Sequence, residues 1–88
     1  ITNTSTGTRF VKFYNATAAN VTVGTTAPDL TWGIPGNSTD DVGAVLNCGP
    51  YGVAFGTALS LAATTGVADN DAGAPGANDV IVALFFRN

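Results

Sequence analysis

The 88-residue sequence contains no histidine, no methionine and no glutamate, and it has a single cysteine, Cys48. Without histidine, the Ser-His-Asp and Cys-His forms of nucleophilic catalysis are excluded, as are zinc sites built from His and Cys. One cysteine cannot form a disulfide framework within the chain. Only Arg9, Lys12 and Arg87 are basic, too few to neutralise the phosphates of a nucleic acid. We therefore expect a protein that is not an enzyme, binds no nucleic acid and uses no cofactor.

Charge is scarce and apolar residues are abundant. Charged residues make up 10% of the chain, hydrophobic residues make up 45%, and the formal net charge is −3. A domain of this length buries only about two-thirds of its unfolded surface, and its core rarely supplies more than about 3–5 kcal/mol. We expect the apolar surplus to form the subunit interface of a homo-oligomer. The alternative is a monomer whose apolar fraction is raised by alanine and glycine.

No stretch of the sequence is apolar over the ~20 residues that a membrane-spanning helix needs. The longest apolar run, residues 53–63, is interrupted by Gly56, Thr57 and Ser60. The first residues, which begin at Ile1, lack the charged start of a signal peptide. We expect no membrane association. A start without Met is typical of a processed product or of a piece of a longer chain.

Eleven glycines and four prolines interrupt the sequence, and threonine, valine and phenylalanine prevail where a helix favours glutamate, lysine and leucine. The sequence predicts one all-β domain over residues 1–88, a small antiparallel β-sandwich or jelly-roll-like barrel of roughly six short strands.

Alternating side chains predict strands over residues 9–15, 29–34, 41–46, 53–63 and 79–87, with a short strand or extended arm over 21–23. Neither face of the first strand is purely polar, so we expect both to be at least partly covered. The last strand is apolar on both faces, which is typical of a doubly covered strand. Residues 66–78 predict a long loop. The expected core consists of Val11, Phe13, Leu30, Ile34, Phe55, Leu59, Leu61, Val80, Val82 and Leu84.

Residues 69–73, Asp-Asn-Asp-Ala-Gly, are similar to the start of a calcium-binding loop, because hard carboxylate oxygens suit a hard cation. The glutamate that completes an EF-hand loop is absent, and Asp and Asn side chains also cap turns. Turn formation is the preferred interpretation, and we expect no metal site. Asp40 and Asp41 would point to opposite faces of a strand, which excludes a shared glycosidase-type site unless the strand bulges.

Aromatic side chains offer a second candidate site. Tyr14, Trp32 and Tyr51 could stack on a sugar or a base, although such residues more often fill a core or an interface. Four Asn-x-Ser/Thr sequons begin at Asn3, Asn15, Asn20 and Asn37, and they arise readily in a chain this rich in Asn and Thr. We expect these sequons to be unused unless the protein is eukaryotic.

Several segments, in the same order, resemble a class of small phage virion proteins. They are residues 9–15 (RFVKFYN), 23–28 (VGTTAP), 34–35 (IP), 52–59 (GVAFGTAL), 66–71 (GVADND) and 77–82 (ANDVIV). The resemblance covers nearly the whole chain. Proteins of this class have a further N-terminal strand, so it implies that residues 1–5 are the tail of such a strand and that part of the domain precedes Ile1.

The resemblance implies a non-enzymatic capsid decoration (cement) protein, on the analogy of β-sandwich trimers that sit on phage heads. Its partners would be its own copies and the major capsid protein, on the surface of a virion assembled in the host cytoplasm. The alternative is a tail-fibre or head-fibre domain that binds host glycans. The residues expected at the interface are Arg9, Phe10, Tyr14, Trp32, Phe85, Phe86 and Arg87.

Overall fold

The structure is a computed structural model that describes residues 1–36, 42–43, 45 and 53–84. Its strands are β1 (Thr2–Asn3), β2 (Arg9–Tyr14), β3 (Leu30–Ile34), β4 (Val42–Gly43), β5 (Ser60–Thr64) and β6 (Val80–Ile81). The one helical segment in these residues is the 3-10 turn η1 (Ala18–Asn20). Every strand pairing is antiparallel, in two sheets with the orders β4-β1-β6 and β3-β2-β5. The prediction of an all-β fold is therefore confirmed.

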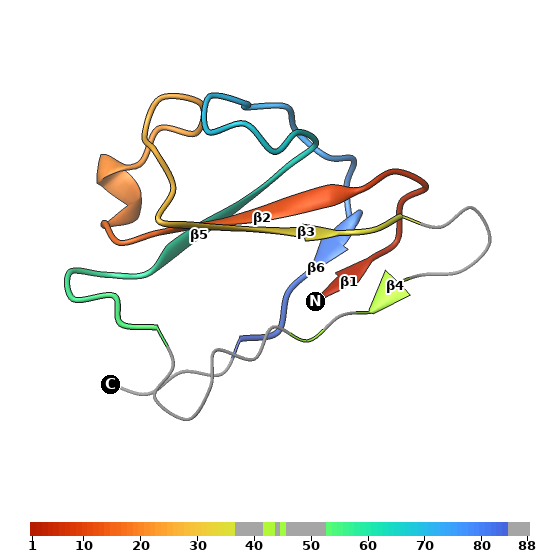
Figure 1. The fold of residues 1–88 in the computed structure, drawn as a ribbon, viewed down its shortest axis with the longest axis horizontal. Coiled ribbons are helices and arrows are strands. Elements are labelled where there is room, and N and C mark those ends of the chain that lie inside the picture. The colour runs from red at the N-terminus through yellow and green to blue at the C-terminus, as the bar shows by residue number, and fades with distance from the viewer. Residues whose placement is uncertain (37–41, 44, 46–52, 85–88) are drawn as a thin grey trace.

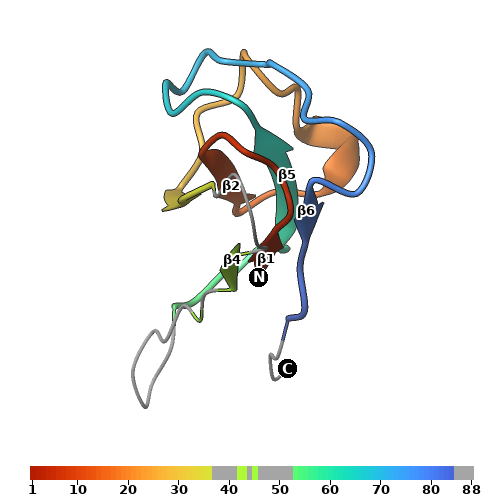
Figure 2. The ribbon, with the colours of Figure 1, turned by 90° about the vertical axis from the view of Figure 1, so that its right-hand side faces the viewer.

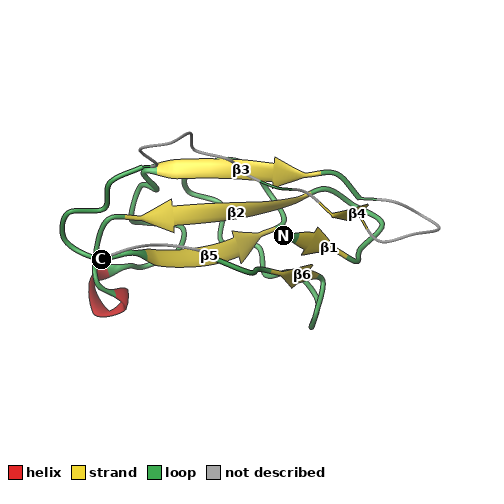
Figure 3. Ribbon diagram, turned by 90° about the horizontal axis from the view of Figure 1, so that it is seen from below, coloured by secondary structure: helices red, strands yellow, loops and turns green. Residues whose placement is uncertain are grey.

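The two sheets share one small core, as in a β-sandwich. The larger sheet, β3-β2-β5, has β2 as its middle strand (Figure 3). Val11 and Phe13 of β2 and Ile34 of β3 form the buried cluster. Ile1, Val80 and Val82, from the β1 and β6 segments of the smaller sheet, pack against that cluster. The inner face of the larger sheet is thus covered by the smaller sheet.

Loops cover the opposite face of the larger sheet. Figure 1 shows the segments around η1 and after β5 arching over β2 and β5. Lys12 and Tyr14 of β2 are buried beneath this layer. Gly24, with a φ of 92°, lies so close to the second loop that a Cβ atom there would be 2.9 Å from the Cβ of Ala72. The expectation that both faces of the first strand are at least partly covered is confirmed.

The predictions for the first two long strands are confirmed, and the one for residues 53–63 is wrong over most of its length. Only Ser60–Thr64 form β5, whereas residues 53–59 form no strand. In this segment the Asn15 side chain competes with strand pairing for two backbone amides. The Asn15 Oδ1 accepts hydrogen bonds from the amides of Thr57 (2.9 Å) and Ala58 (3.3 Å), which are then unavailable to a ladder.

The last predicted strand is also shorter than expected. Of the described residues 79–84, only Val80–Ile81 form β6, because its one partner in the described part of the chain is β1, which pairs through Thr2 and Asn3. Ile81 is 54% exposed, so the expectation of a strand covered on both faces is wrong. Residues 85–87 lie outside the described residues.

The remaining strand predictions have mixed outcomes. Residues 21–23 form no strand, since Thr22 accepts turn hydrogen bonds from the amides of Thr25 and Thr26. The long loop over residues 66–78 is confirmed. Of the predicted strand 41–46, Val42–Gly43 form β4 and Val45 is outside a strand, while the other positions lie outside the described residues.

Most of the expected core is confirmed. Val11, Phe13 and Ile34 are buried, and Leu30, Phe55, Leu59, Val80 and Val82 pack around them. Two residues are exceptions, because Leu61 is 42% exposed and Leu84 is 41% exposed. Leu61 lies opposite Phe13, on the same face of the sheet, but β5 is an outer strand and leaves its side chain half-exposed, while Leu84 lies beyond the end of β6.

The core assignment predicts a difference between two large-to-small substitutions. Ile34→Ala should lower the free energy of unfolding by about 2–4 kcal/mol, because Ile34 is fully buried. Leu61→Ala, a matched change at a half-exposed side chain, should cost about 1 kcal/mol or less. Urea unfolding followed by circular dichroism measures both. Equal losses for the two variants would contradict this description of the core.

Candidate functional site

The structure places the expected interface residues in different environments. Phe10 and Trp32 are half-buried on β2 and β3, and the Phe10 ring lies against Gly33, where a Cβ atom would be 2.9 Å from its Cε1. Tyr14 is only 1% exposed, so it belongs to the interior of the chain, and its assignment to a contact surface is wrong. Phe85, Phe86 and Arg87 lie outside the described residues, as do Asp40, Asp41, Cys48 and Tyr51.

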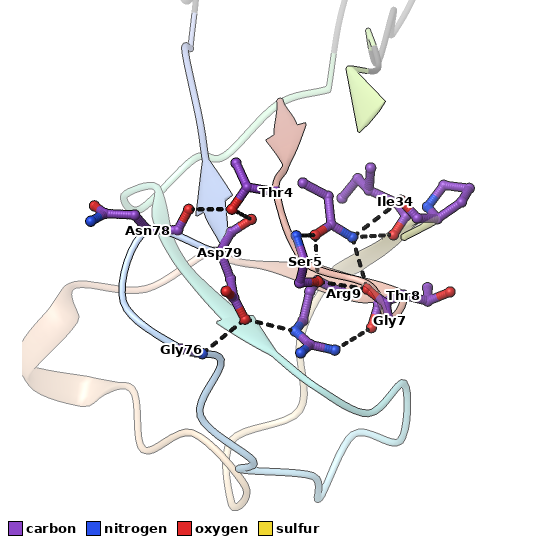
Figure 4. Close-up of polar contacts among 11 residues, drawn as sticks. Thr4, Ser5, Gly7, Thr8, Arg9, Ile34, Gly76, Asn78 and Asp79 are labelled. Atoms are coloured by element: carbon purple, nitrogen blue, oxygen red, sulfur yellow. Dashed lines mark hydrogen bonds and ion pairs between the residues drawn. The ribbon is translucent and has the colours of Figure 1, made fainter. Parts of the chain in front are cut away.

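Arg9 is engaged within its own chain. Its Nε donates to the Asp79 Oδ2 at 3.2 Å, and each of the two side chains is 20% exposed. The same carboxylate oxygen accepts the Gly76 amide at 2.9 Å, and the Arg9 Nη1 donates to the Thr8 carbonyl (Figure 4). Arg9 therefore connects the start of β2 to the residue before β6, and its expected role in an intermolecular ion pair would require breaking this contact.

Asn3 of β1 forms a buried polar cluster beside this ion pair (Figure 4). Its side-chain amide lies within hydrogen-bond distance of the carbonyls of Gly7 (3.0 Å), Ile34 (2.9 Å) and Pro35 (3.1 Å). Its Oδ1 accepts the Ser5 amide at 2.9 Å and lies 2.7 Å from the Ser5 hydroxyl. Since Asn3 is fully buried, its sequon is closed to glycosylation in the folded chain. One side chain thus joins the smaller sheet to the end of β3.

Lys12 is the most unusual residue of the larger sheet. It is fully buried, and its ammonium group donates to the carbonyls of Ala68 (2.6 Å) and Asp71 (3.0 Å). Burying a charge is costly unless hydrogen bonds replace its water. The alternation of residues 9–15 places Lys12 on one face with Phe10 and Tyr14, but the sequence pattern predicts no role for it. A lysine among the apolar residues of this strand is the sequence feature that could have indicated a buried ammonium group.

The loop that holds Lys12 contains the calcium-like residues 69–73. The Asp71 Oδ1 accepts the Gly73 amide at 2.8 Å, which is the turn chemistry that the sequence analysis preferred. Within the described residues, no group of three or more acidic or cysteine side chains is placed to hold a metal ion. In this structure the loop carbonyls bind a cation that belongs to the chain itself, the ammonium group of Lys12.

The hydroxyl of Tyr14 is buried under the same loop layer and has no hydrogen-bond partner among the described residues. Burial raises the pKa of Tyr14 above its ordinary value of 10.0, and the negative charge of Asp69 raises it further. Both effects disfavour the phenolate, so Tyr14 is held in its neutral form.

Large apolar side chains remain at the surface, outside the shared core. The most exposed of them is Val45, at 89%, just after β4. Ile81 lies on β6 and Leu84 beyond it, so that three of these residues belong to the outer strands of the smaller sheet and their continuations. Figure 2 shows these two stretches of chain running away from β1 on either side of it. The others are Val53, Leu61 and Val67.

Comparison of the chain with models of protein families, with curated proteins and with solved structures finds no match. In the part of the chain that the structure describes, no helix has the length and apolar character needed to cross a membrane.

The environment of Lys12 predicts a large effect of removing its charge. Lys12→Met should lower the free energy of unfolding by about 2–3 kcal/mol, because the carbonyls of Ala68 and Asp71 lose their charged donor. Limited proteolysis should cut the loop over residues 66–73 faster than in the wild type. Arg9→Met, which removes a partly solvated ion pair, should cost about 1 kcal/mol or less. A Lys12→Met protein as stable as the wild type would contradict the proposed role of the ammonium group.

The unpaired hydroxyl of Tyr14 gives a pH prediction. Because the pKa is raised in the folded chain, the unfolded chain releases the phenol proton first, and stability falls as the pH rises above about 10. Tyr14→Phe should be at least as stable as the wild type at pH 7, since no described hydrogen bond is lost, and it should lose less stability between pH 9 and pH 11. Urea unfolding across this range measures both, and a parallel decline of the two proteins would count against the assignment.

Proposed function

We propose that this chain is a non-enzymatic structural protein of a phage particle, a decoration protein that stabilises the head by bridging neighbouring capsomers. It would act as a homo-oligomer, most simply a trimer, bound to the major capsid protein on the outer surface of the head. Assembly would take place in the host cytoplasm, where a lone cysteine such as Cys48 stays reduced.

The observation that supports this proposal most strongly is the distribution of apolar residues. The described core has only three buried large aliphatic or phenylalanine side chains, Val11, Phe13 and Ile34. Val45, Ile81 and Leu84 lie instead at the surface of one sheet. Large apolar side chains left exposed in this way are typical of protein–protein contact sites. A protein whose role is to add contact area between subunits needs such a surface and no chemistry.

The physical basis of the proposed activity is mechanical. Packaged DNA presses outward on a capsid and strains the junctions between capsomers. An oligomer seated over a junction adds contacts that must be broken before the capsomers separate. The two-sheet fold suits this role, because its polar clusters around Asn3 and Lys12 fix the loops and strands relative to one another.

Binding to heads tests the proposal. Heads that lack this protein, prepared from a deletion phage, should bind the purified chain in an amount comparable with the number of major capsid subunits. The refilled heads should retain their DNA to a higher temperature than the unfilled heads. Val67→Lys, a charge change in the loop away from the smaller sheet, serves as a control that should bind normally. Saturation at a small fraction of the capsid subunits, together with binding on a glycan array, would instead support a fibre domain.

A further inference from the structure

We propose that the two outer strands of the smaller sheet are the surfaces through which copies of this chain meet, the β6 edge of one copy pairing with the β4 edge of the next. The inference rests on the proposed function, and it names the contact surface of the oligomer. In the sheet order β4-β1-β6, both strands are outermost and have a partner only on their β1 side in the described part of the chain.

The register shows which backbone groups the β6 edge offers. The Thr4 amide donates to the Asp79 carbonyl at 2.7 Å, and the pairing of Thr2 with Ile81 continues the same alignment. Hydrogen-bonded pairs recur at every second residue of an antiparallel ladder. Ile81 therefore turns its backbone groups toward β1, whereas Val80 and Val82 turn theirs toward the outer edge. An added strand would find donors and acceptors at Val80 and Val82.

Side chains make this edge suitable for another apolar strand. Residues 80–84, Val-Ile-Val-Ala-Leu, carry no charge and no proline, the two devices that usually protect an edge strand from pairing. Ile81 is 54% exposed next to this edge. At the opposite edge of the same sheet, Val42 and Gly43 of β4 are also uncharged, and Val45, just after this strand, is 89% exposed. The two edges therefore match each other in their lack of charge and in apolar character.

The charge distribution allows a second copy to occupy these edges. The net charge of the chain is −3, and the two cations of the described residues are engaged internally, Arg9 with Asp79 and Lys12 with loop carbonyls. Two such acidic copies repel each other wherever their carboxylates approach. They can pair at low electrostatic cost along uncharged strands, and the same uncharged strands would leave a basic partner without an ion pair.

The arrangement is head-to-tail, because the two edges that meet are different. Such contacts produce a closed ring when the rotation between subunits completes a circle, and a trimer is one such ring. The larger sheet is less suited to this contact. Its outer strands β3 and β5 are also uncharged, but Leu61 is the only large apolar side chain exposed on them.

Charge substitutions at each edge test the inference. Ile81→Lys and Val45→Lys should each raise the concentration needed for half-assembly by about tenfold or more, because assembly would bury an unpaired charge. Leu61→Lys, on the larger sheet, is the matched control and should assemble as the wild type does. Mass measurement by light scattering reports the assembly, and circular dichroism confirms that each variant is folded. A mixture of Ile81→Lys and Val45→Lys chains should form dimers, since one intact pair of edges remains.

Cysteine substitutions give a second test that adds no charge. In a Cys48→Ser background, chains that carry both Val45→Cys and Ile81→Cys should form disulfide-linked oligomers under mild oxidation. Chains with either cysteine alone should not, because unlike edges meet. Linkage by Ile81→Cys alone would overturn the head-to-tail arrangement. Unchanged assembly of both lysine variants would place the contact elsewhere while leaving the decoration role intact. A monomeric wild type would overturn the edge pairing, and the head-binding experiment would then decide the proposed function separately.

Discussion

The structure depends on the covering of β2 from both sides. As the middle strand of the larger sheet, β2 buries Val11 and Phe13 against the smaller sheet and Lys12 and Tyr14 beneath loops. A lysine in that position must have its ammonium group solvated by the protein. The carbonyls of Ala68 and Asp71 do this, and they fix the loop after β5 over the sheet. The charge and the loop are interdependent, because neither has a stable place without the other.

A second set of polar contacts fixes the smaller sheet to the larger one. Asn3 reaches from β1 to the carbonyls at the end of β3, and the Arg9–Asp79 pair joins β2 to the start of β6. Both β1 and β6 contain two residues, too few for a stable ladder alone. Buried hydrogen bonds to backbone groups that would otherwise be unpaired therefore supply orientation that the short ladders lack. The apolar contacts of Ile1, Val80 and Val82 supply the remaining stability.

The sequence predicts the fold class and the strongest strand but not the polar contacts. Residues 9–15 are predictable because a long alternating run has few alternative structures. Residues 53–59 have the same pattern, yet the amides of Thr57 and Ala58 donate to Asn15, more than forty residues away in the chain. The partners of Lys12 are backbone carbonyls 56 and 59 residues away. Every residue has such a carbonyl, so the sequence cannot show which of them bind the ammonium group. Tyr14 was assigned to an interface because its large ring suits one, but the loop layer that covers it could not be inferred from local pattern.

The exposed apolar residues of the smaller sheet follow from the small size of the chain. A chain of this length lacks the residues to cover both faces of both sheets. The loops around η1 and after β5 are used to bury Lys12 and Tyr14, so the strands at the other end of the fold keep apolar side chains at their outer edges. Edges of this kind are a hazard in a monomer, because they pair with other chains without selection. Selective pairing requires a partner strand of matching length and polarity, and a copy of the same chain supplies both.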